Sequence, residues 1–231
     1  MLLRAGTSGF SFDAWKGPFY DATLPATKML SFYGARLPTV EINNTFYKLP
    51  TEKTLLHWAE EVPPAFRFAL KASRYLTHKL RLKTPKEPLE RFFGLAKALG
   101  DKLGPLLVQL PPYVKKDVPL LEDFLAALPE KRQVALEFRH ASWFDDAVYS
   151  ALKSRGAALV VAETDDEAPH LEWTAPFAYV RLRKVAYGAA ALAEWHERLT
   201  AAPLEEAYVF FKHEDDGLGP KLATAFLALG T

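Results

Sequence analysis

Short apolar stretches of strand length recur along the chain at nearly regular spacing. Each is rich in the β-branched and aromatic residues that favour strands. Between them lie longer segments in which apolar residues recur at helical spacing. This alternation predicts parallel β/α units. The expected strands are Leu2–Ser8, Thr39–Thr45, Arg67–Ser73, Gly104–Leu110, Gln133–Arg139, Ala157–Glu163, Phe177–Arg183 and Glu206–His213.

Two of the intervening helices also show recognisable ends. Thr51 is placed as the N-cap of a helix over Glu52–Glu61, because a threonine hydroxyl can accept from a free amide of the first turn. Gly156 follows a predicted helix at Asp145–Arg155, where glycine is the usual C-terminal residue. The other expected helices cover Ala26–Arg36, Glu87–Leu103, Asp117–Leu128, Ala189–Ala201 and Pro220–Leu229.

The number of units indicates the fold. Eight strands in 231 residues leave roughly 29 residues for each β/α unit, the size expected in a compact barrel. The segment Thr164–Pro176 leaves little room for a helix, so we expect a short sixth unit. We therefore predict one α/β domain over residues 1–231, a single-domain TIM-type (β/α)8 barrel. An open doubly wound sheet is the alternative, but no glycine-rich phosphate fingerprint follows the first strand.

Composition removes several classes of protein. Lys and Arg number 29 and Asp and Glu 28, a net charge of +1, which argues against a globally basic nucleic-acid binder. The absence of cysteine excludes disulfide scaffolds, thiolate metal sites and cysteine nucleophiles. No run of 18 apolar residues and no signal-peptide pattern is present. We expect a cytoplasmic protein with no membrane partner.

Polar residues lie near the C-terminal end of nearly every predicted strand. Alternate residues of a strand share a face, and in a parallel barrel the C-terminal ends carry the active-site loops. Burying unpaired ions is costly, which favours a functional cluster, although an internal ion-pair network is the alternative. The expected cluster contains the cations Lys71, Arg139, Arg181, Arg183 and Lys212, the carboxylates Glu41, Glu137 and Glu163, and the amide Gln109.

The surplus of cations in this cluster suggests a pocket for a small phosphorylated or carboxylated molecule. Arginine offers a planar fork that suits either group. Arg181, Arg183 and Lys212 belong to the seventh and eighth strands, where barrels commonly hold phosphate. Ser8 is assigned as a further ligand contact. It is no nucleophile elbow, because Phe10 replaces the closing glycine of G-x-S-x-G.

Paired carboxylates are the candidates for acid–base chemistry. Glu41 is a possible general base, with Asn43 and Asn44 as amide donors beside it. Glu137 is the second carboxylate, and His140 nearby is a candidate general acid or base. The alternatives are structural: a satisfied hydrogen-bond cluster around Glu41, and an ion pair that holds Glu137.

Three further residues have both a functional and a structural interpretation. Lys71 could act as a Schiff-base lysine, since burial among cations lowers the pKa of an amine, or it could neutralise a glutamate. His78 lies in the long loop over residues 74–88, which could cover the mouth or stay at the surface. Trp143 could contact a ligand or anchor its loop.

Neither a metal nor a cofactor is assigned. No local ligand spacing supports a metal site, and five cations disfavour a divalent ion, which is kept as an alternative. The side chains considered for a metal are Glu41, Glu137, Glu163, Asp165, His140 and His213.

The first loop is crowded with aromatic residues that could stack on a base or sugar ring, or plug the barrel. These are Phe10, Phe12, Trp15, Phe19 and Tyr20.

Several long strings make the chain resemble the YecE-like family, known as domain of unknown function 72. They are GTSGF at Gly6–Phe10, VEINNTFYKLP at Val40–Pro50, FRFALKAS at Phe66–Ser73, LGPLLVQLPP at Leu103–Pro112, ALEFRHASW at Ala135–Trp143 and TAPFAYVRLR at Thr174–Arg183. The resemblance implies a TIM-type barrel without an established activity.

Two strand endings depart from the pattern of that family. The seventh strand ends in Arg181-Leu182-Arg183-Lys184, where the family has a sequence close to RLHG. The eighth ends in Phe211-Lys212-His213-Glu214, where the family has one close to FNND. Both changes add positive charge at the mouth.

Three functions follow as hypotheses. The first is an enzyme of unknown reaction class that acts on a small anionic metabolite. The second is an endonuclease-like barrel that processes nucleic acid, against which the near-neutral charge argues. The third is a non-catalytic module that binds a ligand without turning it over. The oligomeric state does not follow from the sequence.

Overall fold

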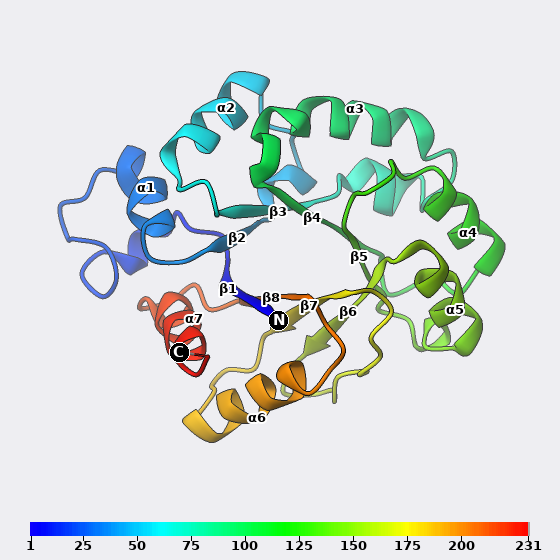
Figure 1. The fold of residues 1–231 in the computed structure, drawn as a ribbon. Helices are drawn as coiled ribbons and strands as arrows, with labels where there is room; N and C mark the ends of the chain where they lie inside the picture. Colours follow the sequence, from blue (N-terminus) through cyan, green and yellow to red (C-terminus); the bar gives the residue numbers. More distant parts are fainter. Residues whose placement is uncertain (231) are drawn as a thin grey trace.

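The computed structural model describes residues 1–230. Eight parallel strands form one closed barrel in sequence order, and β8 pairs back onto β1 (Figure 1). The predicted TIM-type barrel is therefore confirmed. The strands are β1 (Leu2–Ser8), β2 (Thr39–Ile42), β3 (Arg67–Lys71), β4 (Leu103–Gln109), β5 (Val134–Glu137), β6 (Ala158–Glu163), β7 (Phe177–Leu182) and β8 (Glu206–Phe211).

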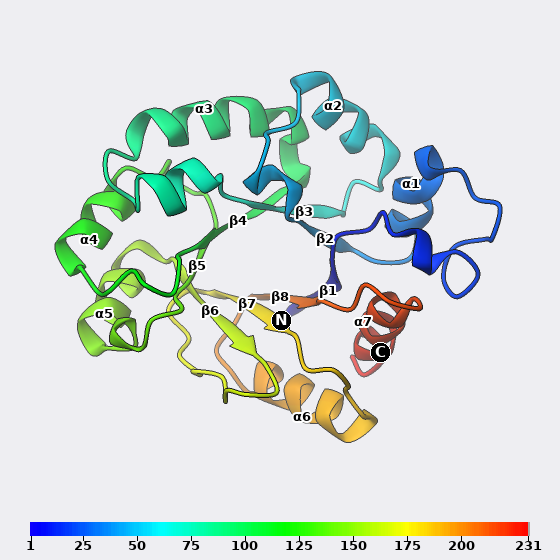
Figure 2. The ribbon, with the colours of Figure 1, turned by 180° about the vertical axis from the view of Figure 1, so that it is seen from behind.

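The α-helices lie outside the ring of strands, as the opposite views in Figures 1 and 2 show. Within residues 1–230, every helix is too short or too polar to traverse a lipid bilayer. The helices are α1 (Met29–Gly34), α2 (Glu52–Glu61), α3 (Lys86–Ala96), α4 (Val118–Ala126), α5 (Asp146–Arg155), α6 (Ala189–Thr200) and α7 (Leu218–Ala228).

The predicted helix ends are found where side chains satisfy free backbone groups. The Thr51 hydroxyl accepts from the amide of Thr54 at the start of α2, and Gly156 ends α5 in the left-handed conformation at φ 66°. The prediction of one helix over Glu87–Leu103 is wrong. Gly100 takes φ 55° and ψ −131°, which breaks the helix and turns the chain into β4.

The sixth β/α unit lacks a helix, as its length predicts. Between β6 and β7 the described chain forms only a loop, which passes outside the barrel between α5 and α6 (Figure 1). The Thr174 hydroxyl ties this loop to the barrel wall. It accepts from the amide of Leu159 at 2.8 Å and donates to the carbonyl of Ala157 at 2.7 Å.

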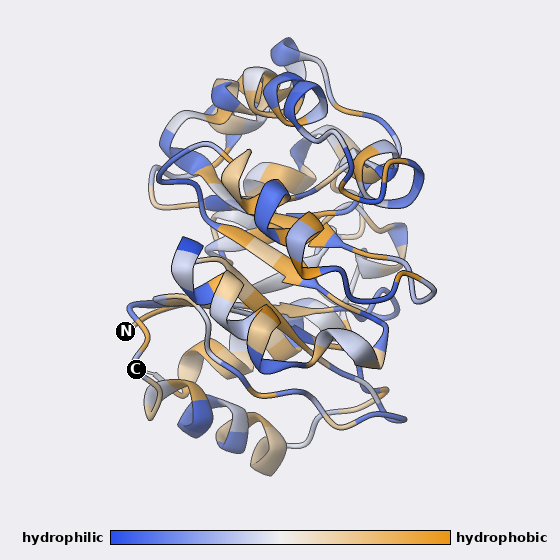
Figure 3. Ribbon diagram, turned by 90° about the vertical axis from the view of Figure 1, so that its right-hand side faces the viewer, coloured by the Kyte–Doolittle hydropathy of each residue, from blue (hydrophilic) through white to orange (hydrophobic). Residues whose placement is uncertain are grey.

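Apolar side chains fill both the barrel and the layer between strands and helices. Figure 3 shows the strands largely in hydrophobic colours and the outer parts of the helices in mixed or hydrophilic ones. At the N-terminal end of the barrel, Arg4 is paired with Glu206 at 2.5 Å. The barrel interior is filled by Ala69, Leu107, Ala135, Ala158, Val160, Phe177, Tyr179, Tyr208 and Phe210.

Several strands stop earlier than predicted, because turns begin directly at their C-terminal ends. After β2 the chain enters a 3-10 turn at Asn44–Phe46. The Thr45 hydroxyl holds this turn by donating to the carbonyls of Ile42 at 3.0 Å and Lys71 at 2.6 Å. The turn therefore fixes the ends of β2 and β3 against each other, at the mouth of the barrel.

Candidate functional site

A cavity of about 480 Å³ opens at the C-terminal ends of the strands. Its volume lies within the range of small-molecule sites, ~300–1,000 Å³. The walls combine cations, amides and rings from loops that are far apart in sequence. The cations are Lys71, Arg139, Arg181, Arg183 and Lys212; the other polar side chains are Ser8, Ser11, Asn43, Asn44, Gln109 and Glu214; the rings are Phe10, Phe12, Phe46, Tyr47 and Trp58.

The strand register explains why the polar residues meet. Ser8 of β1 lies level with Glu41 of β2, and Gln109 of β4 lies level with Glu137 of β5. Each belongs to the set of alternate residues that points into the barrel. The inward-facing residues thus change from apolar in the barrel interior to charged at its C-terminal end.

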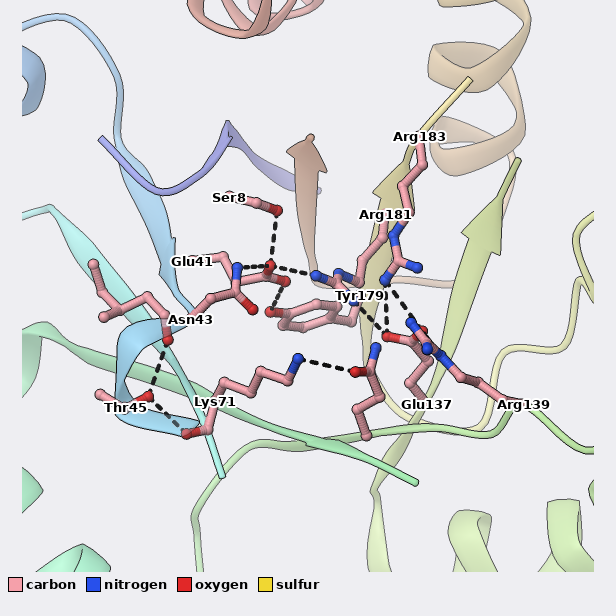
Figure 4. Close-up of polar contacts among 12 residues, drawn as sticks. Ser8, Glu41, Asn43, Thr45, Lys71, Glu137, Arg139, Tyr179, Arg181 and Arg183 are labelled. Carbon is pink, nitrogen blue, oxygen red and sulfur yellow. Dashed lines mark hydrogen bonds and ion pairs between the residues drawn. The ribbon is translucent and has the colours of Figure 1, made fainter. Parts of the chain in front are cut away.

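Arg181 lies between the two buried carboxylates (Figure 4). Its Nη2 is 2.7 Å from Glu41 Oε1, and its Nη1 is 2.6 Å from Glu137 Oε2. The three side chains are almost completely buried, so the charges attract each other in a medium of low dielectric constant. Burial alone lowers the pKa of Arg181, but the two carboxylates raise it above its ordinary value and keep the guanidinium charged.

Glu41 has a full set of hydrogen-bond donors. Ser8 Oγ donates to Oε1 at 2.7 Å, Asn43 Nδ2 to the same oxygen at 2.9 Å, and Tyr179 Oη to Oε2 at 2.8 Å. Burial raises the pKa of Glu41, but Arg181 and these donors outweigh burial and hold it below 4.5. This environment favours the structural interpretation of Glu41, an anion at neutral pH that positions its neighbours, over a general base.

Glu137 is surrounded by guanidinium groups. Besides Arg181, it accepts from Arg183 Nη2 at 3.1 Å and from Arg139 Nε at 3.4 Å. Glu137 lies outside the lining of the cavity, whereas all three arginines belong to it. The carboxylate therefore holds the three arginines in the cavity wall.

Lys71 extends its amine into the cavity from the end of β3. Its Nζ donates to Gln109 Oε1 at 2.9 Å and lies 4.7 Å from the centre of the Phe46 ring. Within residues 1–230, no carboxylate forms an ion pair with this amine. Burial and the charge of Arg181 lower the pKa of Lys71 to about 8, although Glu41 and Glu137 oppose the shift.

Trp143 and His140, both expected at the site, belong to the turn after β5 and lie outside the lining of the cavity. Trp143 is buried, stacks on Phe138 with ring centres 4.4 Å apart, and donates to the carbonyl of Val114 at 2.8 Å. It therefore anchors its loop. His140 accepts from the amide of Ser142 at 3.1 Å and caps the turn after β5. Arg139 is the last residue of the loop after β5 that lines the cavity, and the chain beyond it leaves the mouth.

The inward position expected for Glu163 is wrong. Glu163 accepts from Trp195 Nε1 at 2.9 Å and pairs with Lys184 at 2.8 Å, so it faces α6 outside the barrel. Its neighbour Ala162 occupies the inward position level with Arg181. Alternation along β6 thus removes one carboxylate from the interior and increases the positive surplus there.

The loop after β3 is packed rather than free. A short π-helix spans Tyr75–Lys79, and Leu76 and Leu82 are buried beneath the loop. His78 presents its ring to Phe46, with ring centres 5.0 Å apart. Burial, and then the charges of Lys71 and the neighbouring arginines, lower the pKa of His78. The residue lies beside the cavity, outside its lining.

The aromatic residues of the first loop are divided between a buried plug and the cavity wall. Trp15 and Tyr20 are buried, and Trp15 Nε1 donates to the carbonyl of Glu214 at 2.8 Å, which ties the first loop to the last. Phe10 and Phe12 instead line the cavity. The loop is thus a plug with one face on the cavity.

Several residues of the site were not expected from the sequence. Tyr179 shares the inward face of β7 with Arg181, so its position could have been predicted by alternation. Phe46, Tyr47 and Trp58 line the cavity, but nothing in their local sequence distinguishes them from residues of the core. Among residues 1–230, no three His, Cys, Asp or Glu side chains are grouped so that they could hold a metal ion.

The short GTSGF string has a physical explanation at the site. A Cβ on Gly6 would lie 2.0 Å from the carbonyl oxygen of Thr39, so β1 and β2 can approach only if this residue is glycine. Ser8 donates to Glu41, and Gly9 takes φ 98° as the chain leaves the strand. The string therefore joins close strand packing to the binding of the buried carboxylate.

Fold and site define a single-domain parallel β/α barrel whose mouth is lined by cations above a buried Glu–Arg–Glu triad. The chain belongs to the family described as "Protein of unknown function DUF72", whose model matches residues 4–231. The resemblance recognised in the sequence is thereby confirmed.

Relatives support the same assignment. The chain is 27% identical over 141 residues to the UPF0759 protein YecE of Escherichia coli K12, covering 58% of this chain and 52% of YecE. It is 29% identical over 153 residues to the UPF0759 protein YunF of Bacillus subtilis 168, covering 59% and 53%. The matched stretch thus spans about half of the length of each relative.

Solved structures match over the full chain. The crystal structure of a DUF72 family protein, TM1631, from Thermotoga maritima MSB8 has a TM-score of 0.84 at 28% identity and covers 99% of both chains. That of EF0366 from Enterococcus faecalis V583 has a TM-score of 0.76 at 19% identity, covering 99% of this chain and 97% of the other. The second likeness concerns the fold alone.

Proposed function

We propose that this protein is an enzyme that binds a small phosphorylated or carboxylated compound at the C-terminal mouth of the barrel. The supporting observation is the charge balance of the cavity. Five cationic side chains line the cavity, and among the described residues of its lining Glu214 is the one that is acidic. Glu41 and Glu137 lie beneath the cavity and are already paired with arginines. Two positive charges are therefore left over for a ligand.

The positions of the cations fit an anion better than a structural network. Arg139 and Lys212 are exposed at the mouth, and Lys212 has no ion-pair partner within residues 1–230. A cation at that position gains nothing from the fold alone, whereas it can pair with an entering phosphate or carboxylate. The facing aromatic wall would cover the uncharged part of such a compound.

The proposal is tested by thermal unfolding with orthophosphate, citrate, sugar phosphates and nucleoside monophosphates. A compound at a hundred times its Kd adds about 2.7 kcal/mol to the free energy of unfolding. The double variant Arg139→Ala and Lys212→Ala should lose this effect. A matched variant, Lys153→Ala and Lys221→Ala, removes two surface cations outside the lining and should keep it. The proposal fails if no anion stabilises the protein, or if both variants respond alike.

The nucleic-acid alternative keeps one supporting observation. Tyr47, Tyr75 and Tyr113 are exposed on consecutive loops at the same end of the barrel. Lys79 lies over the Tyr75 ring at 5.3 Å, and Arg81 over the Tyr113 ring at 5.4 Å. Exposed rings beside cations are typical of surfaces that stack single-stranded bases. Binding of a single-stranded oligonucleotide that weakens steeply with salt would support this alternative.

Affinity for an anion without any turnover of it would support the third hypothesis, a non-catalytic binding module.

A further inference from the structure

Lys71 differs from an ordinary ion-paired lysine, because its amine is held inside a cavity by a neutral partner. We propose that Lys71 forms a Schiff base with the aldehyde or ketone group of the small anionic compound that the mouth binds. This inference rests on the proposed function and adds a substrate class to it: oxo acids, or phosphorylated aldehydes and ketones. Lys71 is then a catalytic residue, with Nζ as the nucleophile.

The surroundings of Lys71 favour the neutral, reactive form of its amine. The carboxylates whose charges act on Lys71, Glu41 and Glu137, are already bound to Arg181. With burial and the charge of Arg181 lowering its pKa to about 8, about one tenth of the Lys71 side chain is neutral at pH 7, against about one in three thousand for an ordinary lysine. Only the neutral amine has the lone pair that attacks a carbonyl carbon.

The amine is also positioned. Lys71 is the last residue of β3, and its carbonyl accepts from Thr45 at 2.6 Å, which fixes the backbone. At the other end of the side chain, Gln109 Oε1 accepts from Nζ at 2.9 Å. Figure 4 shows the long side chain stretched between these two contacts, below the Arg181 triad. The nucleophile therefore loses little conformational freedom on reaction.

A free donor lies beside the amine. The hydrogen bond from Lys71 Nζ requires that Gln109 present its oxygen to the amine, so the Nε2 of Gln109 points elsewhere. Gln109 is 6% exposed, and Nε2 is buried without a hydrogen-bond partner in the described structure. An unsatisfied buried donor is costly, and the oxygen of a bound carbonyl group would satisfy it. The same bond would polarise the carbonyl for attack.

The remaining cations define where the anionic end lies. Arg183 and Lys212 line the same cavity from the ends of β7 and β8, and Arg183 Nε is buried without a partner in the described structure. A carboxylate or phosphate bound there leaves an adjacent carbonyl carbon free to face Lys71. This arrangement selects compounds that carry both groups within one small molecule.

The chemical step is balanced. The neutral Nζ adds to the carbonyl carbon, and the carbonyl oxygen takes up a proton to give a carbinolamine. Loss of the hydroxyl group as water then leaves a carbon–nitrogen double bond. Overall, one amine and one carbonyl give one imine and one water, with no oxidant or reductant. Borohydride adds hydride to this double bond and converts it to a stable secondary amine.

The experiment uses this trapping reaction. The protein is incubated separately with pyruvate, glyoxylate and dihydroxyacetone phosphate, reduced with borohydride, digested and mapped by mass spectrometry. At least one probe should label the Lys71 peptide at tenfold or greater excess over the exposed Lys153, and the rate should rise between pH 7 and about 8 before levelling off. The variant Lys71→Arg, which keeps the charge, should lose the label while unfolding at an unchanged temperature.

The possible failures are distinct. If orthophosphate or citrate stabilises the protein but no probe labels Lys71 above Lys153, the Schiff base is refuted and the anion site stands. If neither stabilisation nor labelling occurs, both proposals fall. Labelling of Lys71 that survives the double variant Arg183→Ala and Lys212→Ala unchanged would show a reactive amine without an anion site, and would refute the substrate class.

Discussion

Arg181 and Glu41 form a buried ion pair, with 2.7 Å between Nη2 and Oε1, at the level where the barrel interior changes from apolar to polar. The same guanidinium also binds Glu137. Glu41 also accepts from Ser8 of β1, from Asn43 just after its own strand, and from Tyr179, which shares β7 with Arg181. The pair therefore connects strands β1, β2, β5 and β7 beneath the cavity.

The first prediction concerns the triad itself. Arg181→Met should lower the free energy of unfolding by about 3–5 kcal/mol, because it leaves two buried carboxylates without a partner. Urea unfolding measures the loss. Replacing Glu41 and Glu137 by Gln in the same chain should recover part of it, since no unpaired charge then remains.

A surface pair provides the control for this prediction. Arg198 and Glu194 form an i,i+4 ion pair on α6, where both side chains reach solvent. Arg198→Met should cost less than about 1 kcal/mol. If Arg181→Met costs no more than Arg198→Met, the triad does not hold the barrel together.

The second prediction concerns acid. The pKa of Glu41 in the folded protein lies below its ordinary value of 4.5, so the carboxylate stabilises the fold above that pH. This contribution is lost as the pH falls through the folded pKa. Urea unfolding between pH 7 and pH 3 should therefore show a steep decline below about pH 4.5. In Glu41→Gln the protein should be less stable at pH 7, and its acid decline should be shallower.

The third prediction separates Trp143 from the site. Trp143→Ala removes a buried ring that stacks on Phe138, and should lower the free energy of unfolding by about 3–5 kcal/mol. Measured at a temperature where the variant is folded, its Kd for the stabilising anion should equal that of the parent chain. A tenfold weaker affinity would contradict this prediction and indicate that Trp143 contributes to ligand binding.

The fourth prediction concerns the charge of the mouth. Glu137→Gln removes a negative charge from beneath Arg139 and Arg183. Anion affinity at low salt should rise severalfold, and the gain should shrink as added salt screens the charges. Calorimetric titration with orthophosphate measures both. Glu172→Gln, which changes a surface carboxylate paired with Lys153, should leave the affinity unchanged.

The order and type of the main elements follow from local sequence, because hydrophobic spacing and capping residues act over a few positions. Thr51 begins α2 and Gly156 ends α5 as predicted, and alternation along β2 and β7 places Glu41 and Arg181 inside. The short sixth unit also follows from its length. These features need no knowledge of distant residues.

The exact ends of the strands depend on contacts between segments. The Thr45 hydroxyl reaches the carbonyl of Lys71, 26 residues away, and thereby ends β2 early. Glu163 was assigned to the mouth because it is charged and near a strand end, yet the register with β7 puts Ala162 inside. A prediction from residue type near a strand end therefore needs the register before it can place a side chain.

Sequence alone determined that cations and carboxylates would converge on one end of a barrel, because parallel strands carry their C-terminal ends to the same edge. The tertiary structure decided how those charges are divided. Arg181 pairs with Glu41 and Glu137 in the interior, Glu163 faces α6 outside the barrel, and Lys71 lies beside the neutral amide of Gln109. Which charge neutralises which depends on distances of a few ångströms between strands far apart in the chain, and a linear pattern does not contain those distances.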